Sequence, residues 1–244
     1  TGSTTRQVSI GQVPTVSKIA AIDNGDMTVC AVGVDGSAWC WGPNDYGQLG
    51  TGDVAQGYVP RSAAEGHAFK KISVSTGGAF ACGITLSGQA YCWGSQEGGR
   101  LGDGTLAPGG QFVTAPVAVL GGHTFTDIAA GGDHACGITT GGAAYCWGHN
   151  ERGQLGTGAF ANSSVPVAVS GGLSFTSITT HQVVTCGITA DSAGYCWGEG
   201  AKGNLGSGTS SSSNVPAPIM GGLKFRSLQL GVWTTCGVAA DGDG

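Results

Sequence analysis

Apolar and polar residues alternate with a period of two in short segments, and related segments recur along the whole chain. The clearest copy, Ala135 to Gly148, predicts two short strands joined by a tight turn. Its alternation gives two faces, with Cys136, Ile138, Ala144 and Cys146 on one and Gly137, Tyr145 and Trp147 on the other. Because both faces are apolar, the hairpin should lie between neighbouring sheets. On this interpretation Trp41, Trp93, Trp147 and Trp197 are packing residues.

The first cysteine of each copy marks a regular repeat. These cysteines are Cys30, Cys82, Cys136, Cys186 and Cys236, which stand 52, 54, 50 and 50 residues apart. A period of this length is typical of propellers and solenoids. The turn inside each hairpin should end in a left-handed residue, and glycine fills that place in four of the five copies: Gly36, Gly88, Gly142 and Gly242. Ser192 is the exception, which predicts a strained or differently built turn.

Two further strands flank each hairpin. A short run precedes it in every copy: Val16 to Ile19, Phe69 to Ile72, Phe125 to Ile128, Phe175 to Ile178 and Phe225 to Leu228. A strand with proline near its start follows it, as at Val59-Pro60, Pro116 to Val119 and Pro166 to Val169, and a proline there fits a sheet edge. The sequence therefore predicts an all-β fold, a β-propeller of four-stranded blades of about 50 residues.

The predicted domain is a single propeller over residues 1–244. We expect blade-like repeats at 14–66, 67–121, 122–171 and 172–221, and a fifth split between 222–244 and 1–13, where Val8 to Ile10 would supply a strand. The returning strand of the fifth copy is absent. If the protein continues beyond Gly244, Cys236 should find a partner there and further units would extend the ring toward seven blades. If it ends there, Cys236 is unpaired and an open strand edge would favour self-assembly. We favour the first account, because unpaired backbone groups are costly.

A glycine-rich loop follows each hairpin, as in Asn44 to Gly52. It lacks the helix start and terminal lysine of a phosphate-binding loop, so a nucleotide site is not expected. We interpret one leucine in each loop as a plug into the blade: Leu49, Leu101, Leu155 and Leu205.

Eight cysteines form pairs ten residues apart and opposite each other in the predicted hairpins: Cys30 and Cys40, Cys82 and Cys92, Cys136 and Cys146, and Cys186 and Cys196. Directly opposed strand residues lie close enough for a disulfide. A zinc site is the alternative, but the cysteines lack the short spacing of zinc ribbons and no histidine recurs in register. Repeated disulfides indicate an extracellular or periplasmic protein. We expect no metal and no cofactor.

Composition excludes two classes of partner. The chain of 244 residues contains 48 glycines and has a formal net charge of −5. Without a basic stripe it should not bind nucleic acid. No apolar run approaches the roughly 20 residues of a membrane span, so we expect a soluble chain.

The motifs Tyr145-Cys146-Trp147-Gly148, Asn150 to Gly158 and Pro166 to Val169 resemble the repeat of the regulator of chromosome condensation family. The resemblance covers nearly the whole chain and implies a β-propeller, commonly of seven blades, whose function lies on rim loops. The nuclear founder of the family is an exchange factor for a small GTPase, and a secreted bacterial relative inhibits β-lactamases. This chain has no insertion suited to opening a GTPase, and the relative's shorter repeats lack the Gln-Leu-Gly segment.

The loop before each first hairpin strand varies most between copies and faces the partner in both relatives. Candidate rim residues are Met27, Phe80, Asp133, His134 and Trp233. The alternative is that Phe80, His134 and Trp233 fill the central channel. No catalytic set is expected, because Asp133 and His134 are adjacent in a strand and should point to opposite sides.

The function predicted from these features is that of a secreted, non-enzymatic propeller that binds a protein or glycan through its rim. The alternatives are a structural subunit of an extracellular surface assembly and an inhibitor like the β-lactamase inhibitor relative.

Overall fold

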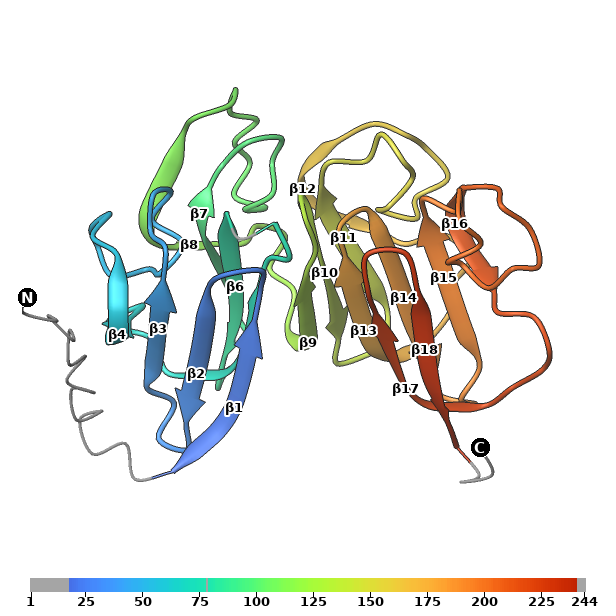
Figure 1. The fold of residues 1–244 in the computed structure, drawn as a ribbon, viewed down its shortest axis with the longest axis horizontal. Helices are drawn as coiled ribbons and strands as arrows, with labels where there is room; N and C mark the ends of the chain where they lie inside the picture. Colours follow the sequence, from blue (N-terminus) through green and yellow to red (C-terminus); the bar gives the residue numbers. More distant parts are fainter. Residues whose placement is uncertain (1–17, 78, 241–244) are drawn as a thin grey trace, which may run out of the picture.

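The computed structural model describes residues 18–77 and 79–240, and every strand in this part of the chain belongs to an antiparallel sheet (Figure 1). This part contains no helix long and apolar enough to cross a membrane. The predicted strand Val8 to Ile10 and the turn residue Gly242 lie outside the described residues.

Four sheets contain four strands each, in sequence order. The first blade comprises β1 (Ile19–Asn24), β2 (Val29–Gly33), β3 (Ala38–Gly42) and β4 (Gly57–Ala63). The second comprises β5 (Phe69–Val74), β6 (Phe80–Thr85), β7 (Ala90–Ser95) and β8 (Phe112–Ala118). The third comprises β9 (Phe125–Ala130), β10 (His134–Thr139), β11 (Ala144–Gly148) and β12 (Ser163–Ala168). The fourth comprises β13 (Phe175–His181), β14 (Val184–Thr189), β15 (Gly194–Gly198) and β16 (Ser213–Pro218). The hairpin of β17 (Phe225–Leu230) and β18 (Thr235–Ala239) follows.

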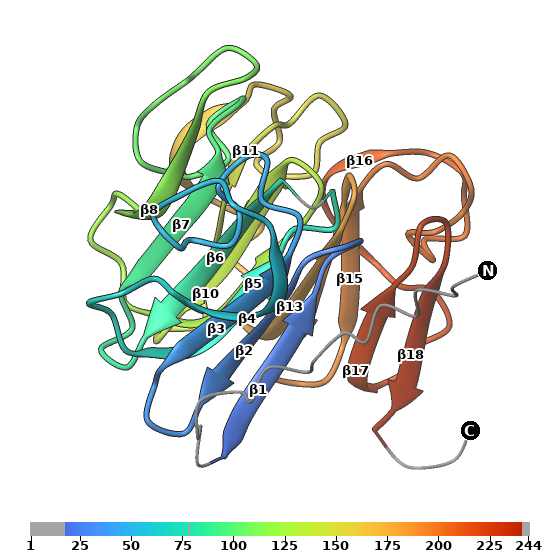
Figure 2. The same ribbon diagram turned by 60° about the vertical axis from the view of Figure 1, so that its left-hand side comes forward.

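The sheets stand side by side along an arc (Figures 1 and 2). The first strand of each blade lies innermost, and consecutive first strands contact each other. Side chains cover the inner edge of the next sheet: Asp23 accepts a hydrogen bond from the Val74 amide at 2.8 Å, and Ser73 accepts one from the Ala130 amide at 3.1 Å. These bonds satisfy amides that an open edge would leave unpaired. The predicted all-β propeller architecture is confirmed.

The blades pack through two unlike faces. The cysteine face of one blade meets the aromatic face of the next, as where Cys136 and Ile138 share a buried cluster with Phe175 and Trp197. Within a blade the aromatic ring lies over a glycine: a Cβ on Gly137 would stand 2.6 Å from the Phe125 ring. Three of the four recurring tryptophans, Trp93, Trp147 and Trp197, are fully buried, as expected for packing residues.

All four expected disulfides form within the hairpins. The predicted register is also correct, with Cys136 opposite Cys146 and Ile138 opposite Ala144. Because their sulfur atoms are bonded to each other, these cysteines are not available as thiolate ligands. Ser192 takes a left-handed φ of 67°, so its turn resembles the glycine turns and carries the strain of a side chain there.

The first inner strand departs from the prediction. Ile19 pairs with Gly33 as Phe69 pairs with Thr85, so Ile19 rather than Val16 occupies the place of the recurring phenylalanine. The prediction that this strand runs from Val16 to Ile19 is therefore wrong by three residues. The aromatic ring needs a glycine beneath it, and here Ala31 stands where the second blade has Gly83. A smaller aliphatic side chain therefore replaces the ring.

The proline-containing strands β4, β8, β12 and β16 form the outer edge of each sheet. Pro60, Pro116, Pro166 and Pro216 lie within them. An edge strand tolerates the missing amide hydrogen, so the predicted edge position is confirmed.

Candidate functional site

Two sets of loops share one face of the propeller, which we call the rim face. They are the loops between the first and second strands of each blade and the longer loops between the third and fourth strands, both at the upper ends of the strands in Figure 1. Antiparallel strands reverse direction at every turn, so these two sets must lie together. The short turns between second and third strands lie on the opposite face.

The long loops are held rigidly to the blades. The side-chain oxygen of Asn44 accepts the Leu49 amide at 2.9 Å, and Asn150 accepts the Leu155 amide at the same distance. Leu49, Leu101, Leu155 and Leu205 are fully buried, which confirms that they plug the blades.

Tryptophans tie three of the four long loops to the next blade. The indole nitrogens of Trp93, Trp147 and Trp197 donate to backbone carbonyls at 3.0, 3.1 and 2.9 Å; the acceptors are Gln48, Arg100 and Gln154. The rim face is therefore an ordered platform on which exposed side chains are held at fixed positions.

One position in the shorter loops points away from the blades. Its occupants are Met27, Ala79, Asp133, Val183 and Trp233, each three residues before the first hairpin cysteine. Met27 is 70% exposed and Trp233 is 54% exposed, while the other three are partly exposed. The structure thus places three of the five predicted rim residues, Met27, Asp133 and Trp233, at accessible positions of this face.

Phe80 and His134 were predicted as rim anchors, and this prediction is wrong. Each is the residue immediately after the exposed position, and alternation turns its side chain between two blades, where both are fully buried. They do not fill the central channel either, because the axial hollow of 540 Å³ is lined by first-strand residues such as Asp127 and His181. Phe80 packs against Leu101 and Trp147, with the Arg100 guanidinium 5.8 Å from its ring centre.

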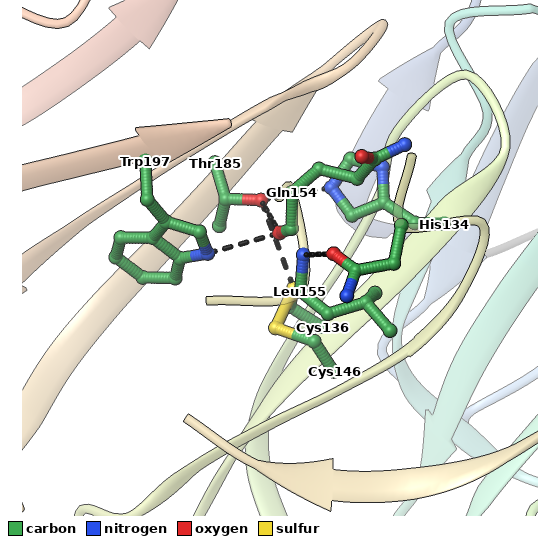
Figure 3. Close-up of a disulfide and its surroundings, with 8 residues drawn as sticks. His134, Cys136, Cys146, Gln154, Leu155, Thr185 and Trp197 are labelled. Atoms are coloured by element: carbon green, nitrogen blue, oxygen red, sulfur yellow. Dashed lines mark hydrogen bonds between the residues drawn. A yellow bond between two sulfur atoms is a disulfide. The ribbon is translucent and has the colours of Figure 1, made fainter. Parts of the chain in front are cut away.

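His134 belongs to a polar contact between the third and fourth blades (Figure 3). Its Nε2 is hydrogen-bonded to Thr185 Oγ1 at 2.8 Å, and that hydroxyl donates to the Gln154 carbonyl at 2.9 Å. The Gln154 carbonyl also accepts the Trp197 indole, beside the Cys136–Cys146 disulfide. Burial lowers the pKa of His134 to about 4, so the ring is neutral at pH 7.

Asp133 points away from this contact and pairs with Arg100 at 3.0 Å. Arg100 also approaches Glu97 at 3.4 Å, so one buried guanidinium joins two loops of adjacent blades. Since Asp133 faces the rim and His134 faces the core, they do not form an acid–base pair acting on one substrate. The arrangement suits binding.

The rim face carries most of the acidic side chains in the loops. Its loops contain eight carboxylates: Asp26, Asp45, Asp53, Glu97, Asp103, Asp133, Glu151 and Glu199. They contain three basic side chains, Arg100, Arg152 and Lys202, so the net charge of these loops is −5 (three minus eight). This asymmetry is not evident from the sequence, because it becomes visible only when the topology assigns loops to faces.

A cleft of 210 Å³ opens between the fourth blade and the β17–β18 hairpin. Its wall includes Val183, Glu199, Asn204, Val232 and Trp233. Trp233 was predicted from the sequence as a rim residue, whereas Glu199 and Asn204 were not. One signal was present: Asn204 stands where Gln48 and Gln154 occur in two other repeats.

Comparison with known proteins gives a consistent result. The family model described as "Regulator of chromosome condensation (RCC1) repeat" matches residues 35–84, 87–138 and 141–188. The chain is 33% identical over 136 residues to the mouse E3 ubiquitin-protein ligase HERC2, which covers 55% of this chain and 3% of that protein.

Solved structures share the fold. Human WBSCR16 aligns with a TM-score of 0.82 at 18% identity, covering 91% of this chain and 58% of the other. Yeast RCC1 (Prp20), in a crystal structure with Kap60, aligns with a TM-score of 0.78 at 19% identity, covering 91% and 54%. The chain thus spans a small part of the ligase and just over half of each of these structures.

Proposed function

Because the chain belongs to the regulator of chromosome condensation (RCC1) repeat family, we propose that it is a non-enzymatic binding propeller that recognises a partner protein through its rim face. One observation carries the proposal: Met27, Ala79, Asp133, Val183 and Trp233 occupy the same accessible loop position, and no two are alike. Variable side chains on a constant, rigid framework are what a recognition surface requires.

A protein partner fits the exposed residue types. Met27 and Trp233 expose large apolar side chains, and methionine and tryptophan are enriched in the cores of protein interfaces. In the related yeast structure Prp20 is bound to a protein, Kap60. The glycan partner that the sequence also allowed becomes an outcome of the experiment below.

We place the protein outside the reducing cytosol, in an extracellular or periplasmic compartment. The support is the four disulfides, whose cysteines are all buried between blades. Folding around reduced thiols at these sites would leave opposed sulfur atoms unbonded in a close-packed interior, so the interblade packing is suited to an oxidising compartment.

Site-specific photo-crosslinking tests the proposal with a pair of positions in the first blade. Met27 lies on the rim face and Val34 lies in the turn on the opposite face, and both are well exposed. A photoreactive amino acid replacing Met27, irradiated in extracellular or periplasmic fluid from the source cells, should give a discrete protein adduct. The same group replacing Val34 should give none. Trp233→Ala in the Met27 probe should abolish the adduct with no change in Tm.

Equal adducts from both positions, or an adduct from Val34 alone, would contradict recognition through the rim face. If no protein adduct forms, and the unmodified protein binds glycans on an array but Trp233→Ala does not, the partner is a carbohydrate and not a protein.

A further inference from the structure

The cleft beside Trp233 contains a buried amide oxygen that has no hydrogen-bond partner among the described residues. Gln48 and Gln154, at the equivalent loop position, each accept a backbone amide two residues back, at 2.9 Å from Tyr46 and Arg152 respectively. Asn204 is one methylene shorter and makes no such bond: its Oδ1 is buried and unpaired among the described residues. Only 7% of Asn204 is exposed. An unpaired buried amide costs free energy that a ligand in the cleft would recover.

The same cleft contains a carboxylate without a cation. Three of the eight rim carboxylates, Asp53, Asp133 and Glu97, each pair with an arginine. Of the other five, Asp26, Asp45 and Glu151 are exposed, and Asp103 accepts hydrogen bonds from Gln96 and Thr105. Glu199 is half-buried and, within residues 18–77 and 79–240, has no basic side chain within salt-bridge distance. A partly desolvated carboxylate attracts a cation more strongly than a fully hydrated one does.

Trp233 and three valines, Val183, Val184 and Val232, form the apolar part of the wall. More than half of the Trp233 side chain is exposed, so a face of the indole is available to a ligand. Tryptophan gives the strongest cation–π contact among the aromatic residues, and the stem of a long basic side chain packs on aliphatic neighbours.

We propose that this cleft takes an arginine or lysine side chain of the partner protein, with the cation between Glu199 and Trp233 and a donor hydrogen directed to Asn204. The inference rests on the proposed function and adds the chemistry of the partner. The net charge of −5 on the rim loops favours a basic segment over an acidic one. It also favours a cation over a neutral sugar, which would leave the Glu199 charge uncompensated.

The test uses two synthetic peptides on the purified chain. Hexa-arginine supplies the cation, and hexa-citrulline has nearly the same shape without the charge. Calorimetric titration should show hexa-arginine binding at least about tenfold more tightly than hexa-citrulline. Glu199→Gln and Trp233→Ala should each lower the affinity for hexa-arginine about fivefold to tenfold, because each removes one face of the cation site.

Two further variants separate this site from general attraction. Glu151→Gln removes an acidic charge from the corresponding loop of the third blade and should change the affinity by less than about twofold. Asn204→Gln should restore the loop bond seen at Gln48 and Gln154, so it should weaken the peptide about threefold without lowering Tm.

Equal weakening by Glu199→Gln and Glu151→Gln would show diffuse attraction and overturn the cleft. Equal binding of the two peptides would contradict a cationic ligand. Trp233-dependent binding of a neutral oligosaccharide in place of hexa-arginine would contradict it as well. If the peptides fail while the Met27 crosslink persists, this inference is wrong and the proposed function stands. If the crosslink also fails, both are wrong.

Discussion

At the scale of single residues, His134 makes the interface between the third and fourth blades sensitive to acid. The ordinary histidine pKa of 6.5 falls to about 4 on burial. At this histidine the unfolded chain therefore binds a proton at higher pH than the folded chain does. The contribution of the buried neutral ring to folding stability is present above pH 6.5 and is lost as pH falls toward 4. The shift corresponds to about 3 kcal/mol.

Thermal unfolding between pH 7 and 4.5 checks this expectation. Tm should fall through this window, and His134→Gln should flatten the slope, since glutamine can still bond to Thr185 but does not titrate. The window lies above the ordinary carboxyl range, and the pKa of Asp191 is lowered further, to about 2, by Thr189 and Lys224. An unchanged slope in His134→Gln would contradict the assignment, and the partly buried His181, whose pKa is also lowered by burial, would be the next candidate.

The exposure of single residues could be predicted from sequence where the alternation of side chains along a strand was clear. It could not be predicted where the residue at which that alternation begins was unknown. Met27 and Trp233 were correctly placed on the surface. Phe80 and His134 are one residue further along, and the loop sequence did not indicate where alternation begins. Asn204 could not be recognised as unpartnered, because its missing bond depends on the position of a backbone amide.

At the scale of elements, the glycine-rich loops offer a matched pair of substitutions. Gly50 and Gly52 both have left-handed φ values, 68° and 81°. A Cβ on Gly50 would stand 2.7 Å from the Trp93 indole nitrogen, whereas a Cβ on Gly52 would meet nothing within 4 Å. Gly50→Ala should destabilise by about 3 kcal/mol and Gly52→Ala by about 1 kcal/mol, because backbone strain is common to both and the clash is not.

Denaturant unfolding of the two variants measures the difference. If both lose the same stability, the approach of the loop to the next blade contributes nothing beyond backbone strain, and the described contact between Gly50 and Trp93 does not hold the loop.

Elements were predicted well because each carries its own repeated signal. The hairpin register follows from paired cysteines ten residues apart, and the outer edge follows from proline. The first inner strand was misplaced because its repeat lacks the phenylalanine used to align the others. Its alignment is given instead by the pairing of Ile19 with Gly33, which is a relation between strands.

At the scale of the whole molecule, the 50-residue period was sufficient to predict a propeller, because a sheet with two apolar faces must stack on others. The period does not indicate which loops gather on the same face or what their summed charge is. The acidic character of the rim and the cleft beside Trp233 arise from the topology and from contacts between blades, so they required the structure.

The partner identified by crosslinking can be purified and added to the unmodified protein. Hydrogen–deuterium exchange of the protein with and without this partner tests the central claim most directly. We predict slowed exchange at the rim face, in residues 25–28, 131–134, 199–204 and 231–234, and unchanged exchange in the turns 34–37, 86–89, 140–143 and 190–193. Protection confined to those turns, with the rim loops unaffected, would place recognition on the opposite face and contradict the account.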